Sequence, residues 1–249
     1  LMQYFGTIET KYDEIFLTQS YMYFNKEDEE ITIKELKEKI KTAKDRKNNI
    51  IGTVFLYSPM VTPVGFDSNK YLLEQDFEDF GKMIELKAET YITVFKQAMR
   101  ANCEGKIVEI RNLFNLIERN IDIPVLLEKF NNDLESYNSF QTTQFDRDIM
   151  YLDAANLIPS GKFVFFCWGD KIKEKEFPYI NDYAKTLYEN SMKLGKKVIF
   201  VYKKEKTQQG AVDYLQFSNP MQNHKYKNSI ITSIKKAFEE FPPSVTPYE

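Results

Sequence analysis

Polar side chains suited to ligand recognition follow apolar, strand-like segments at four points along this 249-residue chain. The four groups are Ser58 with Pro59, Asn112, Trp168 with Asp170, and Asn219 with Pro220. An asparagine amide both donates and accepts hydrogen bonds, so it can pair with the edge of a nucleobase. A proline restricts the residue before it to extended or turn conformations and so fixes that side chain. The pattern predicts a recognition site if the four segments end at one edge of a sheet.

Each of these residues also has a purely structural interpretation. Ser, Asn and Asp commonly cap turns and helix starts in the loops of α/β proteins. A tryptophan at the end of an apolar strand, such as Trp168, is more often a core residue than a ligand contact. Both interpretations stay open from the sequence alone.

The segments that would position these residues alternate between strand and helix patterns. Strands are predicted at residues 50–57, 106–113, 162–169, 197–202 and, more briefly, 214–217, of which 50–57 is expected to be buried and 162–169 is the most strongly apolar. Helices are predicted from apolar residues at helical spacing over 73–99, 124–130, 142–157, 179–194 and 229–241. This alternation predicts a three-layer α/β/α fold with a mostly parallel central sheet. In such a sheet, ligands bind beyond the carboxyl ends of the strands.

The first 46 residues are predicted to form a strand and helix extension packed on the core, before an α/β domain over residues 47–249. The segment 14–24 is rich in aromatic and β-branched residues and predicts a strand at a sheet edge. Apolar residues then recur at helical spacing after Thr32, which forms a capping-box motif with Glu35. We therefore expect a surface helix soon after the first strand.

Composition and cysteine usage place the chain among globular proteins. Hydrophobic residues make up 43% of the chain and aromatic residues 15%, which excludes a disordered protein. No apolar run approaches the roughly 18–20 residues that cross a bilayer, and the first residues lack a targeting pattern. Cys103 and Cys167 are far apart in the sequence and are not expected to form a disulfide, and Cys167, inside an apolar strand-like run, is expected to be a buried thiol. We expect a cytoplasmic protein without a membrane partner.

Positive charge is concentrated in the C-terminal part of the chain. The net charge of −3 argues against a protein that coats duplex DNA. Residues 161–249 nevertheless contain 15 Lys against 10 acidic residues. Lysine groups that include Lys171, Lys203 and Lys225 lie beyond the predicted strands, and they predict an anion site at the same edge of the sheet. The alternative is a solvated surface, of which alternating Lys and Glu residues are typical.

Four short motifs occur in a fixed order along the chain: VFLYSPMVTPVGF, IVEIRNLF, FVFFCWG and FSNPMQNH. Their order and content resemble the uracil-DNA glycosylase superfamily. The resemblance covers roughly residues 50–241 and is closest to the mismatch-specific branches and to an uncharacterised bacterial offshoot with a Trp-Gly motif and a terminal His-Pro or Asn-Pro motif. It implies a pocket that takes up a flipped base.

The resemblance implies roles for individual positions. Ser58 falls where the superfamily places an Asp or Asn that positions the attacking water, and Phe66 falls near an aromatic residue that stacks on the base. Asn112 falls where an asparagine reads the base edge. Asn219 falls where a His or Asn contacts the leaving base.

The chain departs from the superfamily pattern at its first motif. A serine hydroxyl at position 58 is no general base unless another group activates it, so Asp67 or Asp170 would have to supply the base. His224, the single histidine, is either a proton donor or phosphate contact at the site, or an exposed loop residue. One histidine argues against a transition-metal site, and the chain lacks glycine-rich phosphate loops, so no metal or cofactor is expected.

Two hypotheses for function follow. In the first, the protein binds a nucleotide or single-stranded or flipped-base nucleic acid and hydrolyses an N-glycosidic bond. In the second, it is an inactive relative that binds a nucleotide signal, or a protein partner through the aromatic segment 3–24. Ser58 in place of a carboxylate or amide favours the second hypothesis.

Overall fold

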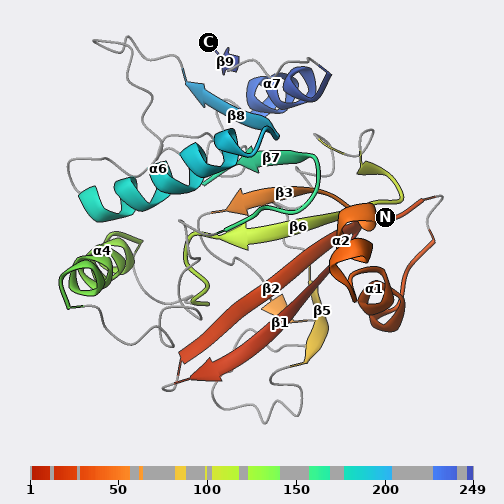
Figure 1. Cartoon of the computed structure of the whole chain (residues 1–249), viewed down its shortest axis with the longest axis horizontal. Coiled ribbons are helices and arrows are strands. Elements are labelled where there is room, and N and C mark those ends of the chain that lie inside the picture. The colour runs from red at the N-terminus through yellow and green to blue at the C-terminus, as the bar shows by residue number, and fades with distance from the viewer. Residues whose placement is uncertain are drawn as a thin grey trace.

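The computed structural model describes most of the strands and helices that the sequence predicts (Figure 1). The described residues are 2–11, 14–26, 29–56, 62–63, 82–87, 99, 103–117, 123–140, 157–168, 177–203, 227–239 and 246–248. They form a mixed α/β fold built on one large sheet.

Nine strands of the described chain lie in this sheet, in the order β4-β5-β1-β2-β6-β3-β7-β8-β9. They are β1 (Met2–Lys11), β2 (Glu14–Phe24), β3 (Ile50–Leu56), β4 (Thr62–Pro63), β5 (Met83–Lys87), β6 (Ile107–Asn112), β7 (Phe163–Phe166), β8 (Lys197–Lys203) and β9 (Thr246–Tyr248). The strands predicted at 50–57, 106–113, 162–169 and 197–202 are confirmed as β3, β6, β7 and β8. The predicted strand 214–217 lies outside the described residues.

The described helices are α1 (Ile33–Lys39), α2 (Ala43–Asn49), α4 (Ile123–Phe140), α6 (Pro178–Lys193) and α7 (Lys227–Glu239). The helices predicted over 179–194 and 229–241 are confirmed as α6 and α7, and the one predicted over 124–130 continues to Phe140. Residues 142–156 of another predicted helix lie outside the described chain. Within the described segments, no helix has both the length and the apolar character needed to cross a membrane.

The sheet has a parallel part and an antiparallel part. The strand pairs β6-β3, β3-β7, β7-β8 and β8-β9 are parallel, as predicted for a sheet with helical connections. The pairs β4-β5, β5-β1, β1-β2 and β2-β6 are antiparallel. The sheet is therefore mixed rather than mostly parallel, with the expected parallel pairs on one side of β6 and antiparallel pairs on the other.

Two expectations for the N-terminal segment are wrong. The strand predicted at a sheet edge is β2. It lies between β1 and β6, and most of its side chains are buried on both faces of the sheet. The segment 3–24 was expected to present an aromatic surface to a partner, yet Tyr4, Phe5, Tyr21 and Phe24 are all nearly fully buried. The aromatic residues of this segment pack inside the protein.

The predicted helix over 73–99 is also wrong at Met83–Lys87, which forms β5. This strand pairs with β1 in an antiparallel register that aligns Tyr4 with Leu86 and Thr7 with Met83. Met83 and Leu86 are buried by that pairing, which is a contact between segments far apart in the sequence. Of the other residues in the predicted helix, only Lys82 and Met99 lie within the described chain.

Alternate side chains of the central strands face different helices. Val54 and Leu56 of β3 belong to the apolar cluster that includes residues of α7, whereas Phe55 belongs to the cluster of α4 and α6. On the Phe55 face, Leu36 of α1 packs with Ile107 at the start of β6. Along the strands, Figure 1 shows α1 and α2 near the starts of β3 and β6 and α4 toward their carboxyl ends.

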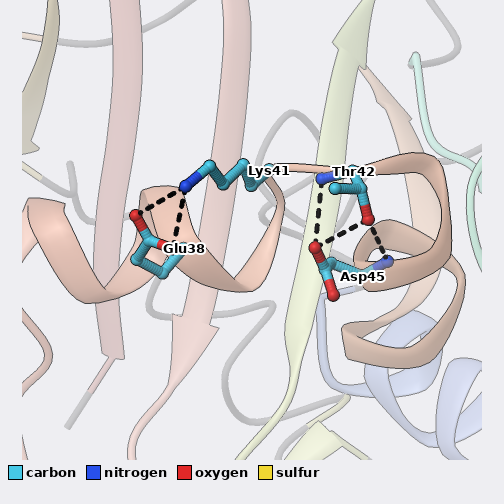
Figure 2. Close-up of polar contacts among 4 residues, drawn as sticks. All are labelled: Glu38, Lys41, Thr42 and Asp45. Atoms are coloured by element: carbon cyan, nitrogen blue, oxygen red, sulfur yellow. Dashed lines mark hydrogen bonds and ion pairs between the residues drawn. The ribbon is translucent and has the colours of Figure 1, made fainter.

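Local hydrogen bonds set the start of α1 and of α2. Thr32 and Glu35 form the predicted capping box of α1. A second capping box, which was not predicted, begins α2: Asp45 N donates to Thr42 Oγ1 at 3.1 Å, and Thr42 N donates to Asp45 Oδ2 at 3.2 Å (Figure 2). Next to it, Lys41 pairs with Glu38 at 3.4 Å. These hydrogen bonds fix the start of α2, and so they fix the backbone of Arg46, the residue after Asp45.

Candidate functional site

The carboxyl ends of β6, β3 and β7 lie side by side, as predicted for the recognition site. The parallel register pairs Leu56 with Asn112 and Phe55 with Phe166. Leu113 N donates to Leu56 O at 2.9 Å, and Cys167 N donates to Phe55 O at 2.9 Å, just past the last paired residues. Ligands of parallel sheets bind at such an edge.

Asn112 is the predicted site residue with the most informative environment. The residue is 2% exposed, and its Oδ1 atom is buried with no hydrogen-bond partner within the described part of the chain. A buried carbonyl without a partner costs about 1–3 kcal/mol. Asn112 lies two residues past Ile110 on β6 and so shares the sheet face that carries the α7 cluster. An unsatisfied acceptor at a strand end is where a ligand donor can bind.

Trp168 packs as a core residue. It is 1% exposed, and its ring lies 5.0 Å from Phe166 and 6.4 Å from Phe55, between ring centroids. These contacts place the indole in the cluster of α4 and α6, on the sheet face opposite Asn112. The structure therefore does not bring Asn112 and Trp168 together on one face. A ligand would reach the indole faces only if a neighbouring ring moved.

Most other predicted site residues lie outside the described part of the chain. They are Ser58, Pro59, Phe66, Asp67, Asp170, Lys171, Asn219, Pro220, His224 and Lys225. Lys203 is the last residue of β8, and so its backbone lies at the carboxyl edge of the sheet.

A buried ion pair in the middle of the sheet was missed by sequence reasoning. Glu109 of β6 is 2% exposed, and its Oε1 lies 2.6 Å from Nη2 of Arg111. Thr53 Oγ1 donates to Ser160 O at 2.9 Å and lies 3.3 Å from Glu109 Oε2. The signal was present in the motif IVEIRNLF, because two opposite charges two residues apart on a strand share one face. The apolar residues of the motif are enough to predict the strand, and they do not indicate the ion pair.

The ion pair sits in a polar row that crosses three strands. The sheet register aligns Tyr21 of β2 and Thr53 of β3 with Glu109, on the face that carries α1, α4 and α6. Burial raises the pKa of the Tyr21 hydroxyl, and the charge of Glu109 raises it further, whereas Arg46 and Arg111 lower it. The row therefore places one buried carboxylate in contact with the guanidinium of Arg111.

Lys196 lies just before β8, at the amino ends of β7 and β8. Its Nζ donates to Gly161 O at 2.6 Å. Burial lowers the pKa of Lys196, and the negative charge of Glu109 opposes that effect. Gly161 has φ +77°, and a side chain there would collide with the backbone of Ile51 and Gly52, so glycine is required where this loop crosses β3.

The chain matches no family model, and searches of curated proteins and of solved structures return no significant match. The resemblance to the glycosylase superfamily therefore stays a prediction from the four motifs. Of these, the described residues include the strand ends at Asn112 and Trp168.

The two cysteines are excluded as nucleophiles by their surroundings. Neither forms a disulfide, and both are fully buried, as predicted for Cys167. Burial raises the pKa of Cys103 to about 12 and raises the pKa of Cys167 well above its ordinary range, although Cys167 lies at the carboxyl edge of β7. A thiol is nucleophilic as its thiolate, which this burial disfavours.

Proposed function

We propose that the protein binds a nucleotide, or an unpaired base of single-stranded nucleic acid, at the carboxyl edge of β6, β3 and β7, and that Asn112 reads the edge of the base. The observation that carries this proposal is the buried, unpartnered Oδ1 of Asn112. A base that presents an N–H donor to this oxygen would satisfy it and could accept a hydrogen bond from the same amide.

The position of Asn112 supports a functional rather than a structural role. The residue next to it across the sheet is Leu56, and the preceding residue on the same face is Ile110. A leucine at position 112 would continue this apolar surface and remove the cost of an unsatisfied carbonyl. Residues that break a local stability rule in this way are concentrated at functional sites.

The complete proposal also includes a three-layer fold and a reaction. Apolar residues of α1, α4 and α6 on one face of the sheet and of α7 on the other support a three-layer α/β/α arrangement. The reaction is hydrolysis of an N-glycosidic bond, with Ser58, Asp67, Asp170 and Asn219 as its groups. Glu109 does not supply the base for a ligand held by Asn112, because its carboxylate is engaged by Arg111 on the other face of the sheet.

The second candidate is binding of the same ligand without hydrolysis. The observation that favours it is Ser58, since a hydroxyl stands where the similar superfamily places an amide or carboxylate. Both candidates share the base-reading role of Asn112 and differ only in whether free base is produced.

A ligand panel with two matched variants tests the proposal. Nucleobases, nucleosides, nucleotides and short single strands are added to the wild-type protein, and the change in melting temperature is measured. Asn112→Leu should abolish the shift and leave the unliganded protein at least as stable as the wild type. Asn181→Leu is the control, because Asn181 is another buried asparagine with an unpartnered Oδ1 in the described chain, but it lies on α6.

Asn181→Leu should retain the full ligand-induced shift. A panel that shifts no melting temperature, or a shift that survives Asn112→Leu, would overturn the proposal. Chromatography of the mixtures then distinguishes the two candidates, because only hydrolysis releases free base. Ligand stabilisation without free base assigns binding alone.

A further inference from the structure

We propose that Arg111, held in place by Glu109, forms a second binding site on the other face of the sheet, and that its ligand is a phosphate group. The site uses residues of the polar row and does not rest on the nucleobase proposal. Asn112 and Arg111 are neighbours in sequence, so on a strand their side chains point to opposite faces.

Arg111 has donors left over after pairing with Glu109. A guanidinium carries five N–H donors, and the described ion pair uses Nη2. The Nε atom is buried, and it has no hydrogen-bond partner in the described segments. The side chain of Arg111 is 23% exposed, whereas that of Glu109 is 3% exposed. The arginine therefore reaches the surface of the site, and the glutamate lies behind it.

The surrounding contacts hold the guanidinium in a fixed position. Glu109 is anchored through Thr53, which is itself bonded to the backbone of Ser160. Phe55 is aligned with Arg111 across the sheet and is fully buried. A side chain that is ordered before binding loses little conformational entropy when the ligand arrives. An arginine oriented in this way matches the two oxygens of a phosphate with parallel hydrogen bonds.

The local charge favours an anion with more than one negative charge. Glu109 is the carboxylate of the polar row, and Arg111 is the cation that contacts it. A dianionic phosphate is attracted to the guanidinium of Arg111 more strongly than a monoanionic carboxylate is.

The helices leave a polar strip of the sheet beside Arg111. Gln19 of β2 is exposed and lies one residue from Ser20, which pairs with Ile110 of β6. Thr7 of β1, which pairs with Gln19, is half-buried. The neighbouring apolar clusters cover the starts of the strands with α1 and their ends with α4 and α6. Arg111 therefore lies between two covered areas, next to side chains that reach solvent.

Isothermal titration calorimetry with inorganic phosphate tests this site. At constant ionic strength we expect saturable binding to the wild type and similar binding of glycerol 3-phosphate. Arg111→Lys keeps the charge and removes the paired donors, so it should weaken binding about tenfold, the effect of one charge-assisted hydrogen bond. Lys41→Gln removes an exposed charge between α1 and α2 and should leave binding unchanged.

Three results would overturn the inference: no saturable binding of phosphate, wild-type affinity in Arg111→Lys, or acetate binding as tightly as phosphate. If Arg111→Lys does not fold, chemical protection of the wild-type protein gives the same decision. Phenylglyoxal modifies arginines, and phosphate should slow its reaction with Arg111 more than with the exposed Arg46, as read by peptide mass spectrometry. Equal slowing at both residues would contradict a site at Arg111.

Discussion

Removal of one partner of the Glu109–Arg111 pair should have unequal effects on stability. Arg111→Met leaves a carboxylate with a 3% exposed side chain and without its main partner. Loss of one partner from a buried pair costs about 3–5 kcal/mol, because the remaining charge stays desolvated. Glu109→Leu leaves an arginine whose side chain is 23% exposed, so water can solvate part of it. We expect that variant to cost about 1–2 kcal/mol, close to the value of one charge-assisted hydrogen bond.

The double variant separates these costs from the value of the pair itself. Replacement of both residues removes the buried charge together with its partner, and such replacements are often nearly neutral. The double variant should therefore be more stable than Arg111→Met alone. Urea unfolding followed by circular dichroism gives the free energy of unfolding for all four proteins.

Two outcomes would refute this reasoning. If Arg111→Met is no more destabilising than Glu109→Leu, the buried carboxylate does not depend on the arginine in the way that the distances indicate. If the two single effects add in the double variant, the side chains are not energetically coupled, because independent sites add and contacting ones do not.

Three further predictions concern other parts of the fold. Asn131→Ala should lower the free energy of unfolding, measured with urea, by about 1–2 kcal/mol, and Asn132→Ala, at an exposed residue, should lower it much less. The reason is that Asn131 Oδ1 accepts backbone N–H bonds at the start of α6, where the N-cap residue makes no side-chain hydrogen bond. Equal losses in the two variants would contradict this. Cys103 and Cys167 should resist a thiol reagent at pH 8 until urea unfolds the protein, and rapid labelling of both in native buffer would show that they are accessible. Burial raises the pKa of Tyr4, so the folded state favours its neutral form and stability should fall as the pH rises above about 10. Tyr4→Phe should reduce that alkaline loss, measured by urea unfolding at pH 8 and pH 11, and an undiminished loss would count against it.

Local and strongly patterned features of the fold could be predicted from the sequence. The central strands β3 and β7 are largely apolar runs, because both faces of these strands are covered. The capping box of Thr32 and Glu35 lies within four residues and needs no tertiary contact. Both kinds of signal are contained in short windows of sequence.

Features that depend on distant contacts were missed. The segment that forms β5 has apolar residues that also fit a helix, and its strand conformation follows from pairing with β1, about 80 residues away. The same limit applies to the site. Sequence reasoning singled out Asn112 because it ends a strand. It also placed Trp168 beside Asn112, because the pattern does not show which face of the sheet each side chain occupies. Alternation along the strand and packing decide that face.

The resonance of the Asn112 side-chain amide tests the central claim most directly. It can be assigned in a nitrogen–proton correlation spectrum as the amide pair that disappears in Asn112→Leu. When the stabilising nucleobase or nucleotide is added to the wild type, this pair should shift strongly and saturate with the same Kd as the thermal response, because the ligand satisfies the unpartnered Oδ1. If the ligand binds while the Asn112 amide pair stays unchanged, Asn112 does not read the base and the proposed site is contradicted.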